Sequence, residues 1–204
     1  MTDIGIDCKY GSSKHSCVHP YLLPAIRRIV AAERPSRIFD LGCGNGSAAN
    51  SLSRFAPVTG VDISPSGVAI AQRSFPHLTI EIGSVYDDLA ARYGEFPIVV
   101  SLEVVEHLYA PRLYAKRLFE LVERGGVAIV STPYHGYLKN LALALSGRLD
   151  THFTALWDGG HIKFWSIKTL SVILEEAGFS RLSFLRVGRV PVLAKSMVAI
   201  ARKD

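Results

Sequence analysis

Residues 37–50 read R-I-F-D-L-G-C-G-N-G-S-A-A-N, and this stretch decides the fold. Its apolar start, from Ile38 to Leu41, predicts a short buried strand, and the glycines that follow predict a tight turn into a helix. A glycine-rich turn between a strand and a helix lets the backbone approach a ligand closely, because a side chain there would block the approach.

The spacing of the glycines and the acid before them narrow the choice of ligand. Gly42, Gly44 and Gly46 follow the pattern G-x-G-x-G, which differs from the G-x-G-x-x-G of dinucleotide sites. Asp40 precedes them by two residues, and its carboxylate would repel a diphosphate. A ligand with an amine and ribose hydroxyls but no phosphate suits this turn better. The alternative interpretation is a glycine-rich turn of another kind of α/β protein.

The stretch D-L-G-C-G-N-G resembles the first motif, D-x-G-x-G-x-G, of class I S-adenosylmethionine-dependent methyltransferases. This resemblance covers about residues 20–204. It implies a Rossmann-like α/β fold with a mostly parallel sheet of seven strands, helices on both faces and an antiparallel last strand. It also implies that S-adenosylmethionine is the cofactor.

Apolar strands and amphipathic helices alternate along the chain, which is typical of a parallel sheet covered on both faces. The predicted strands are residues 38–41, 58–63, 78–82, 97–102, 127–131, 181–187 and 193–201, and the predicted helices are residues 21–33, 47–55, 66–75, 112–124 and 166–177. We expect a single domain over residues 21–204, preceded by a polar segment, residues 1–20, that is either a leader or a cap over the cofactor site. Residues 132–165 interrupt the alternation and are predicted to be a substrate lid.

The second predicted strand ends in Asp62, followed by Ile63. An acid at this place, about 20 residues after the glycines, is suited to accept hydrogen bonds from ribose hydroxyls. The alternative role for Asp62 is a helix N-cap, although Ser64 fills that role better because a proline and a helix follow it.

The resemblance implies two further cofactor contacts. The turn at residues 83–88 would hold the adenine, with Ser84 at its amine and Val85 on its face, unless it is an ordinary polar turn. Ser101 and Leu102, where the fourth strand ends, would place backbone carbonyls against the methionine part of the cofactor.

Residues 103–107, E-V-V-E-H, carry the candidate chemistry toward the methyl acceptor. If they form a helical turn, Glu103, Glu106 and His107 fall at i, i+3 and i+4 on one face and could bind a divalent ion. The stretch resembles the O-methyltransferases of ubiquinone biosynthesis, which implies Mg²⁺ at these residues holding a phenolic oxygen and lowering its pKa. The alternatives are that His107 acts as a general base without metal, or that the two acids only favour a helix N-terminus.

Histidines and aromatic residues gather in the predicted lid. His161, just before the last large helix, is a second catalytic candidate that either lines the acceptor pocket or caps the helix. His135, which follows the fifth strand, is a weaker catalytic candidate than His161. Within residues 139–149, Leu141, Leu145 and Leu149 would share one helical face, which suits either a cover for the pocket or a peripheral contact with a membrane surface.

Composition and charge limit the other kinds of protein that this sequence could encode. The chain has 204 residues and a net charge of +5, but its basic residues are scattered and indicate no clear nucleic-acid site. The three cysteines have no metal-like spacing, the first residues lack the features of a signal peptide, and no run of 18 apolar residues occurs, so we expect a cytoplasmic protein.

The sequence therefore predicts an enzyme that transfers a methyl group from S-adenosylmethionine to a small molecule, with a phenolic or quinol-like oxygen as the leading acceptor. One rival is methylation of RNA or protein, although the fourth strand is followed by S-L-E-V and not by the D/N-P-P-Y/F-like motif of base N-methylation. The other rival is a non-catalytic module that binds the cofactor. The sequence leaves the acceptor and the oligomeric state open.

Overall fold

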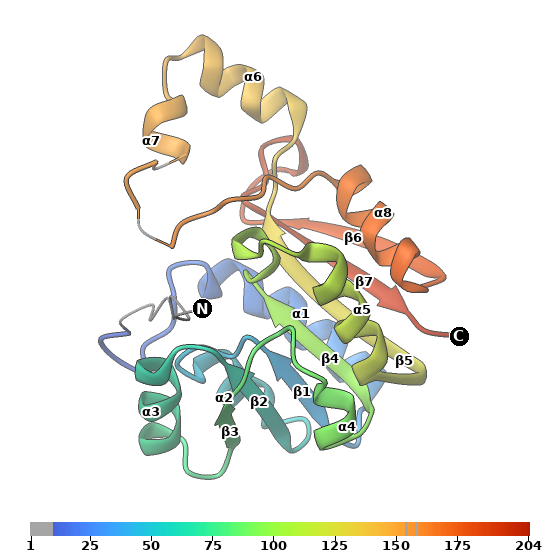
Figure 1. Ribbon diagram of the computed structural model, residues 1–204. Helices are drawn as coiled ribbons and strands as arrows, with labels where there is room; N and C mark the ends of the chain where they lie inside the picture. The colour runs from blue at the N-terminus through green and yellow to red at the C-terminus, as the bar shows by residue number, and fades with distance from the viewer. Residues whose placement is uncertain (1–9, 154, 158) are drawn as a thin grey trace.

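Seven strands form one mixed sheet in the order β3-β2-β1-β4-β5-β7-β6 in a computed structural model, which describes residues 10–153, 155–157 and 159–204 (Figure 1). The strands are β1 (Ile38–Leu41), β2 (Val58–Asp62), β3 (Thr79–Ile82), β4 (Phe96–Leu102), β5 (Val122–Pro133), β6 (Arg181–Val187) and β7 (Ser196–Arg202). Strands β1 to β5 pair in parallel, and β7 lies antiparallel between β5 and β6. The predicted Rossmann-like sheet with its antiparallel last strand is confirmed.

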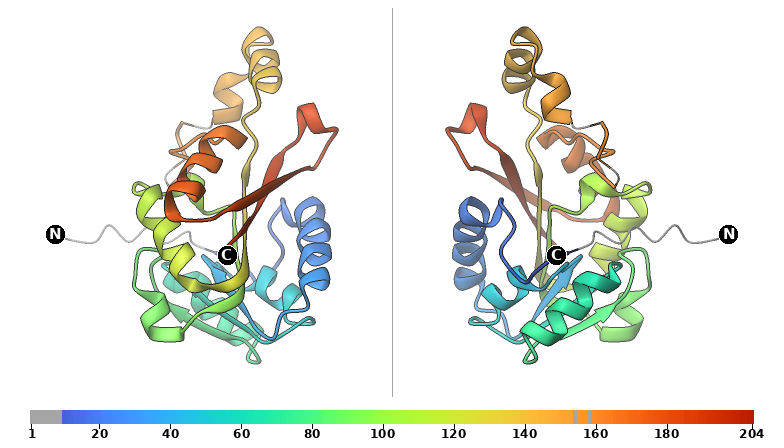
Figure 2. Two further views of the ribbon diagram at one scale, coloured as in Figure 1. Left: turned by 90° about the vertical axis from the view of Figure 1, so that its right-hand side faces the viewer. Right: turned by 90° about the vertical axis from the view of Figure 1, so that its left-hand side faces the viewer.

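Helices cover both faces of the sheet, as the two side views show (Figure 2). One apolar cluster joins the sheet to α1 (His19–Glu33), α2 (Ser47–Leu52) and α3 (Pro65–Ser74). A second cluster, on the other face, contains side chains from α4 (Leu89–Tyr93), α5 (Pro111–Leu121) and α8 (Ile167–Ala177). The central strands β1 and β4 are mostly apolar because both of their faces are buried, and their polar residues Asp40 and Ser101 lie toward their carboxyl ends. All of β1 and nearly all of β4 are buried.

The boundary between α5 and β5 differs from the prediction of a helix over 112–124 and a strand over 127–131. Helix α5 ends at Leu121, and β5 begins at Val122, which pairs with Phe96. The register then shifts, so that Val127 pairs with Ile98. Gly125, at φ 79°, lies within this irregular stretch, where its backbone turns as a β-branched or bulky residue could not.

The predicted lid projects beyond the carboxyl end of β5 and contains two helices, α6 (Tyr137–Leu145) and α7 (Leu149–Phe153) (Figure 1). A single helix over residues 139–149 was expected, and this is wrong. Gly147, at φ 65°, lies between the two helices, so Leu149 does not share a face with the leucines of α6. The side chain of Lys139, in the first turn of α6, is buried.

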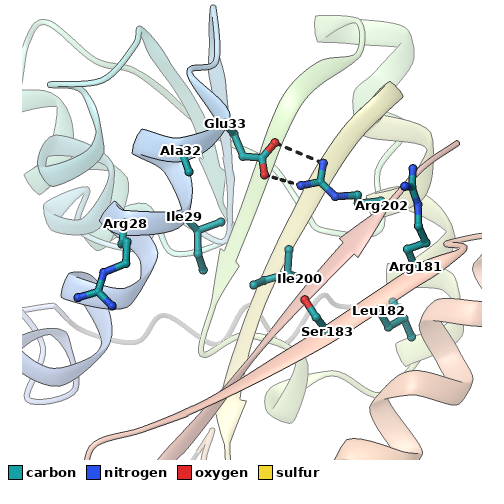
Figure 3. A pocket seen from close by; sticks show the side chains of 9 residues that line it. All are labelled: Arg28, Ile29, Ala32, Glu33, Arg181, Leu182, Ser183, Ile200 and Arg202. Carbon is teal, nitrogen blue, oxygen red and sulfur yellow. Dashed lines mark hydrogen bonds and ion pairs between the residues drawn. The ribbon is translucent and has the colours of Figure 1, made fainter.

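A groove of about 400 Å³ lies between α1 and strands β6 and β7 (Figure 3). The ion pair from Arg202 to Glu33, 2.5 Å from Nη2 to Oε1, crosses one end of it, and Arg181 on its wall pairs with Asp204. Arg202 also pairs in register with Val127 at the amino end of the parallel part of β5. This end of the groove is therefore opposite the edge where ligands of α/β sheets bind.

Two of the three cysteines, Cys17 and Cys43, are described, and both are free thiols. Cys8, and the part of the predicted leader before residue 10, lie outside the described residues. Among the helices that the structure describes, none has the length and apolar character needed to cross a membrane.

Candidate functional site

The glycine loop lies at the carboxyl end of β1. Gly42, Gly44 and Gly46 all have positive φ, at 85°, 53° and 75°, a backbone region that other residues adopt only with strain. The loop is also closely packed, since a β-carbon on Gly42 would lie 2.6 Å from Val104 Cγ2. Helix α2 starts directly after Gly46. The loop therefore keeps its shape and its close packing only with glycine.

Asp40 lies in β1 beneath this loop, with its side chain buried. Its Oδ2 has no hydrogen-bond partner among the described residues. Burial and, second, the charge of Asp62 raise the pKa of Asp40 to about 7. A buried carboxylate without a donor is costly, so this oxygen favours a ligand that brings a cation or an N–H group.

Asp62 fixes the glycine loop to the end of β2. Its Oδ2 accepts the backbone N–H of Gly44 at 2.7 Å, and its Oδ1 accepts the N–H of Ser64 at 2.8 Å. The cap of α3 is Ser64, whose hydroxyl accepts the Gly67 N–H, so the expected N-cap role of Ser64 is confirmed. Carboxylate oxygens have further lone pairs, which leaves Asp62 able to accept ribose hydroxyls. The neighbouring Ile63 is 49% exposed and offers an apolar surface beside it.

The turn after β3 and the end of β4 lie on either side of this acid in the strand order β3-β2-β1-β4. In the turn, Asp87 Oδ2 accepts the Ser84 N–H at 2.8 Å, and Val85 packs against the apolar cluster. At the end of β4, Ser101 is buried and its hydroxyl donates to the Leu41 carbonyl at 2.8 Å. The Ser101 side chain thus joins β4 to β1, and only its backbone could face a ligand, as could that of Leu102.

The strand ends thus bring together all the residues predicted for the cofactor. These are Asp40, Gly42, Gly44, Gly46, Asp62, Ile63, Ser84, Val85, Ser101 and Leu102. The set contains two carboxylates close to a glycine loop and no lysine or arginine that could neutralise a phosphate. S-adenosylmethionine fits this chemistry through its ammonium, its sulfonium and its two ribose hydroxyls.

The stretch from Glu103 to His107 does not form the expected helical turn. Glu103 has φ 57°, in the left-handed region, and a short 3₁₀ helix, η1 (Val105–His107), begins two residues later. The expectation that Glu103, Glu106 and His107 share one helical face is therefore corrected. A non-glycine residue in this conformation is held there by its surroundings.

Those surroundings are two serines from distant strands. The Ser131 hydroxyl accepts the Glu103 backbone N–H at 3.0 Å and donates to Glu103 Oε1 at 2.9 Å, while the Ser196 hydroxyl lies 3.4 Å from Oε2. Burial raises the pKa of Glu103 to about 7 although both serine hydroxyls oppose this shift. The Glu103 carboxylate is engaged within the protein and lies outside the cluster described next.

Glu106, His107 and His161 form a cluster in which one ligand atom from each lies within 4.8 Å of the others. The side chain of Glu106 is 1% exposed, and neither carboxylate oxygen has a hydrogen-bond partner among the described residues. Burial, followed by the charge of Glu103, raises the pKa of Glu106 well above its usual range, although the Glu106 backbone N–H and the nearby Thr132 hydroxyl act in the opposite direction. A buried acid without a hydrogen bond of good geometry beside two imidazoles has the composition of a site for a proton or a metal ion.

The backbone of the lid orients His107. Its Nδ1 lies 2.9 Å from the Gly159 carbonyl oxygen and 3.2 Å from that of Gly160. A carbonyl only accepts, so Nδ1 carries a proton, and in the neutral form of the ring Nε2 has the lone pair that could meet a cation or a substrate proton. The His161 ring lies 4.9 Å from the His107 ring, and burial and then His107 lower the pKa of His161 to about 4. The neutral His161 ring is therefore suited to act as a ligand to a cation.

Aromatic rings of the lid lie in two groups, one at this cluster and one around His135. Trp157 packs edge-on against His107, and His135 is surrounded by the rings of His152, Phe153 and Phe164. Burial lowers the pKa of His135 to about 4, with smaller contributions from Lys139 and His152. His135 thus belongs to a ring-lined wall of the lid, separate from the Glu106 cluster.

Several residues of the site were not predicted from the sequence. They are Ser131 and Ser196, which hold Glu103, and Tyr10 and Asn45, which belong to the contact between the N-terminal segment and the glycine loop. The polar pair S-T that ends the apolar run of β5 was a usable signal for Ser131, since strand ends meet at the ligand edge. Nothing local to Ser196 or Tyr10 indicated their roles.

A family model described as "Methyltransferase domain" matches residues 17–183. The chain belongs to this family. The match covers most of the chain, including the glycine loop, the Glu106 cluster and the lid of this methyltransferase domain.

Relatives and solved structures agree with this assignment. A ubiquinone biosynthesis O-methyltransferase of Azorhizobium caulinodans is 33% identical over 152 residues, which are 70% of this chain and 58% of the relative. One from Dinoroseobacter shibae is 29% identical over 180 residues, 79% of this chain and 71% of the relative. The crystal structure of the methyltransferase domain of bacterial CtHen1 superposes with a TM-score of 0.67 at 22% identity, covering 88% of this chain and 96% of that one. The chain spans about half the length of several curated relatives that it matches.

Proposed function

We propose that this protein transfers a methyl group from S-adenosylmethionine to an oxygen of a small phenolic or quinol-like molecule. The single observation that carries the acceptor chemistry is Glu106, an acid with both oxygens buried and unpartnered beside His107 and His161. Oxygen must lose its proton to become a nucleophile, and this cluster lies next to the end of β4, where the cofactor is expected. The resemblance to relatives named ubiquinone biosynthesis O-methyltransferases supports the same class of acceptor.

On the cofactor side, the proposed roles follow from charge and hydrogen bonding. Asp62 accepts the ribose hydroxyls, and Asp40 favours the positive amine end from beneath the loop. Ser84 and Val85 hold the adenine, and the backbone of Ser101 and Leu102 contacts the methionine part. The sulfonium is an intrinsically good leaving group, so the protein mainly aligns the two reactants and excludes water, worth up to roughly 7–11 kcal/mol in favourable cases.

On the acceptor side, Glu106, His107 and His161 would hold a divalent cation, or His107 alone would take the proton through Nε2. When bound, the cation lowers the pKa of the acceptor hydroxyl. Two imidazoles and one carboxylate suit Mn²⁺, Fe²⁺ or Zn²⁺ better than Mg²⁺, which prefers oxygen ligands. Glu103, the third member of the predicted Mg²⁺ set, is hydrogen-bonded by Ser131 and Ser196 and is given no part in holding the cation.

The test is formation of S-adenosylhomocysteine with 3,4-dihydroxybenzoate and with a simple hydroquinone as acceptors, each with and without added divalent cation. The matched control acceptor is 3,4-dimethoxybenzoate, which has no free ring hydroxyl. The proposal expects turnover only with the free hydroxyls and its loss in His107→Ala. Turnover on RNA or protein alone would replace it with the rival enzyme class. Cofactor binding without turnover on any acceptor would favour a non-catalytic module.

We also propose that the lid contacts an anionic membrane surface through α6. Tyr137 and Leu145 are 90% and 81% exposed, and Leu138 and Leu141 lie more than half exposed on the same helix. Helix α6 packs against η2 (Pro191–Leu193), which adds the exposed Val190, Val192 and Leu193. Apolar side chains next to Arg148 and Arg189 suit the boundary between lipid tails and acidic headgroups.

Vesicle flotation tests the membrane contact. The protein should float with phosphatidylglycerol-containing vesicles, and Leu145→Asp should reduce the bound fraction strongly. The matched control is Val172→Asp on α8, an exposed apolar residue on another element. Equal flotation of both variants, or no flotation of the unaltered protein, would leave α6 as only a cover for the pocket.

A further inference from the structure

The ring of Tyr10 lies against two glycines that are far apart in the sequence. A β-carbon on Gly44 would lie 2.5 Å from Tyr10 Oη, and one on Gly67 would lie 2.9 Å from Tyr10 Cδ2. Both distances are shorter than contacts that real β-carbons make. The glycine loop and the start of α3 therefore form a slot that admits the ring only because both residues lack side chains.

The backbone conformation of Gly67 does not explain why glycine occupies this position. It lies in the first turn of α3, and unlike Gly44 it does not have a positive φ. Glycine is a poor helix former, so at such a position alanine would ordinarily be better. A β-carbon on Gly67 would lie 3.0 Å from the Gly44 carbonyl oxygen and 2.9 Å from the Tyr10 ring. Its absence therefore leaves room for both groups. The close approach of the N-terminal segment accounts for the residue.

The segment around Tyr10 is fastened to the same two elements. The Tyr10 backbone N–H donates to Ser66 Oγ at 3.2 Å. The buried amide of Asn45, in the glycine loop, donates through Nδ2 to the carbonyls of Ser12 and Lys14 at 2.8 and 3.0 Å. Residues 10–14, which we call the strap, thus connect the loop after β1 with the start of α3.

We propose that the Tyr10 ring forms one wall of the cofactor site. The strap that carries this ring would cover the ribose of the bound cofactor. Gly44, on which the ring rests, donates its N–H to Asp62, so the ring lies beside the carboxylate proposed to accept the ribose hydroxyls. A ring held there excludes water from that carboxylate and contacts the sugar. The strap must open for the cofactor to exchange, so Tyr10 acts mainly on the rate of release. This inference rests on the proposed use of S-adenosylmethionine.

The test is stopped-flow measurement of the binding and release of S-adenosylhomocysteine. We expect Tyr10→Ala to raise the dissociation rate constant about tenfold, with a smaller change in the association rate constant, since lost contacts mostly speed release. Tyr10→Phe keeps the ring and should stay within about twofold of the unaltered protein. Leu185→Ala, which removes an exposed apolar side chain of the edge strand β6, is the matched control and should change neither rate.

A thermal melt without ligand checks that each variant is folded. Unchanged rates in Tyr10→Ala, or tighter binding because the ring had occupied the ligand's space, would overturn the inference. Absence of binding by the unaltered protein would instead contradict the proposed function. A double-variant cycle with Gly67→Ala adds a second readout: if the added β-carbon acts by displacing the ring, its effect on release is smaller in the Tyr10→Ala background.

Discussion

The two sides of the proposed site are built in different ways. The core of the cofactor side is the glycine loop after β1 with Asp40, in β1, and Asp62, at the end of β2. The acceptor side is made of side chains from the end of β4, from β5, from the lid and from β7. The cofactor side depends on glycine and on the pairing of neighbouring strands. The acceptor side depends on contacts between segments that are far apart in the sequence.

This difference shows in how each side handles buried charge. Asp62 on the cofactor side is satisfied by backbone N–H groups of its own loops. Glu106 on the acceptor side has no partner, and Glu103 is held by hydroxyls 28 and 93 residues away in the sequence. We therefore expect the cofactor side to be rigid in the free protein and the acceptor side to be completed by what binds there.

The largest expected effect is a loss of folding stability, and it should differ between two glycines of similar φ. Gly46 lies on the cofactor side and Gly147 lies in the lid. Gly46→Ala should lower the free energy of unfolding by about 3 kcal/mol, because left-handed strain adds to a β-carbon 2.8 Å from that of Ala71. Gly147→Ala, in the lid, should cost only about 1 kcal/mol, since nothing lies within 4 Å of its added β-carbon. Urea denaturation measures both, and equal losses would mean that the cofactor loop is no tighter than the lid.

The second prediction concerns the cluster on the acceptor side. Saturating Mn²⁺ or Zn²⁺ should raise the melting temperature by about 5 °C, since a ligand at 100 times its dissociation constant adds about 2.7 kcal/mol. His161→Ala should abolish this shift. His77→Ala, which removes an exposed histidine outside the cluster, should leave the shift unchanged. A shift that survives in His161→Ala would place the ion elsewhere, and no shift in the unaltered protein would favour His107 as a metal-free base.

The third prediction is the pH dependence of the cofactor side. Because the pKa of Asp40 is raised to about 7, its contribution to folding stability is complete below pH about 4 and is lost as the pH rises through about 7. Affinity for S-adenosylhomocysteine should change in the opposite direction, rising up to about tenfold between pH 6 and 8, because ionised Asp40 attracts the ammonium. Calorimetry on Asp40→Asn should give a flatter profile, and an equally steep one would assign the pH dependence to another group.

The sequence predicted the fold because its signals are local. Apolar runs such as that of β4 mark buried parallel strands, and the ends of such strands meet at one edge, which placed Asp40, Asp62 and Ser101 together. It failed at Glu103 because the helical spacing took no account of Ser131 and Ser196, which hold that carboxylate from distant strands. His161 was predicted as a catalytic candidate but not as the partner of Glu106, since only the folded lid brings it there.

The most direct test of the central claim, that the ends of β1 to β4 form a site for S-adenosylmethionine, is calorimetric titration with S-adenosylhomocysteine. The unaltered protein should bind one molecule per chain. Asp62→Ala should bind about 100-fold more weakly, because hydrogen bonds to a charged group contribute about 1.5–3 kcal/mol each. Glu176→Ala, which removes an exposed acid of α8 that pairs with Arg112, should bind normally. No binding by the unaltered protein, or equal affinity in Asp62→Ala, would contradict the account.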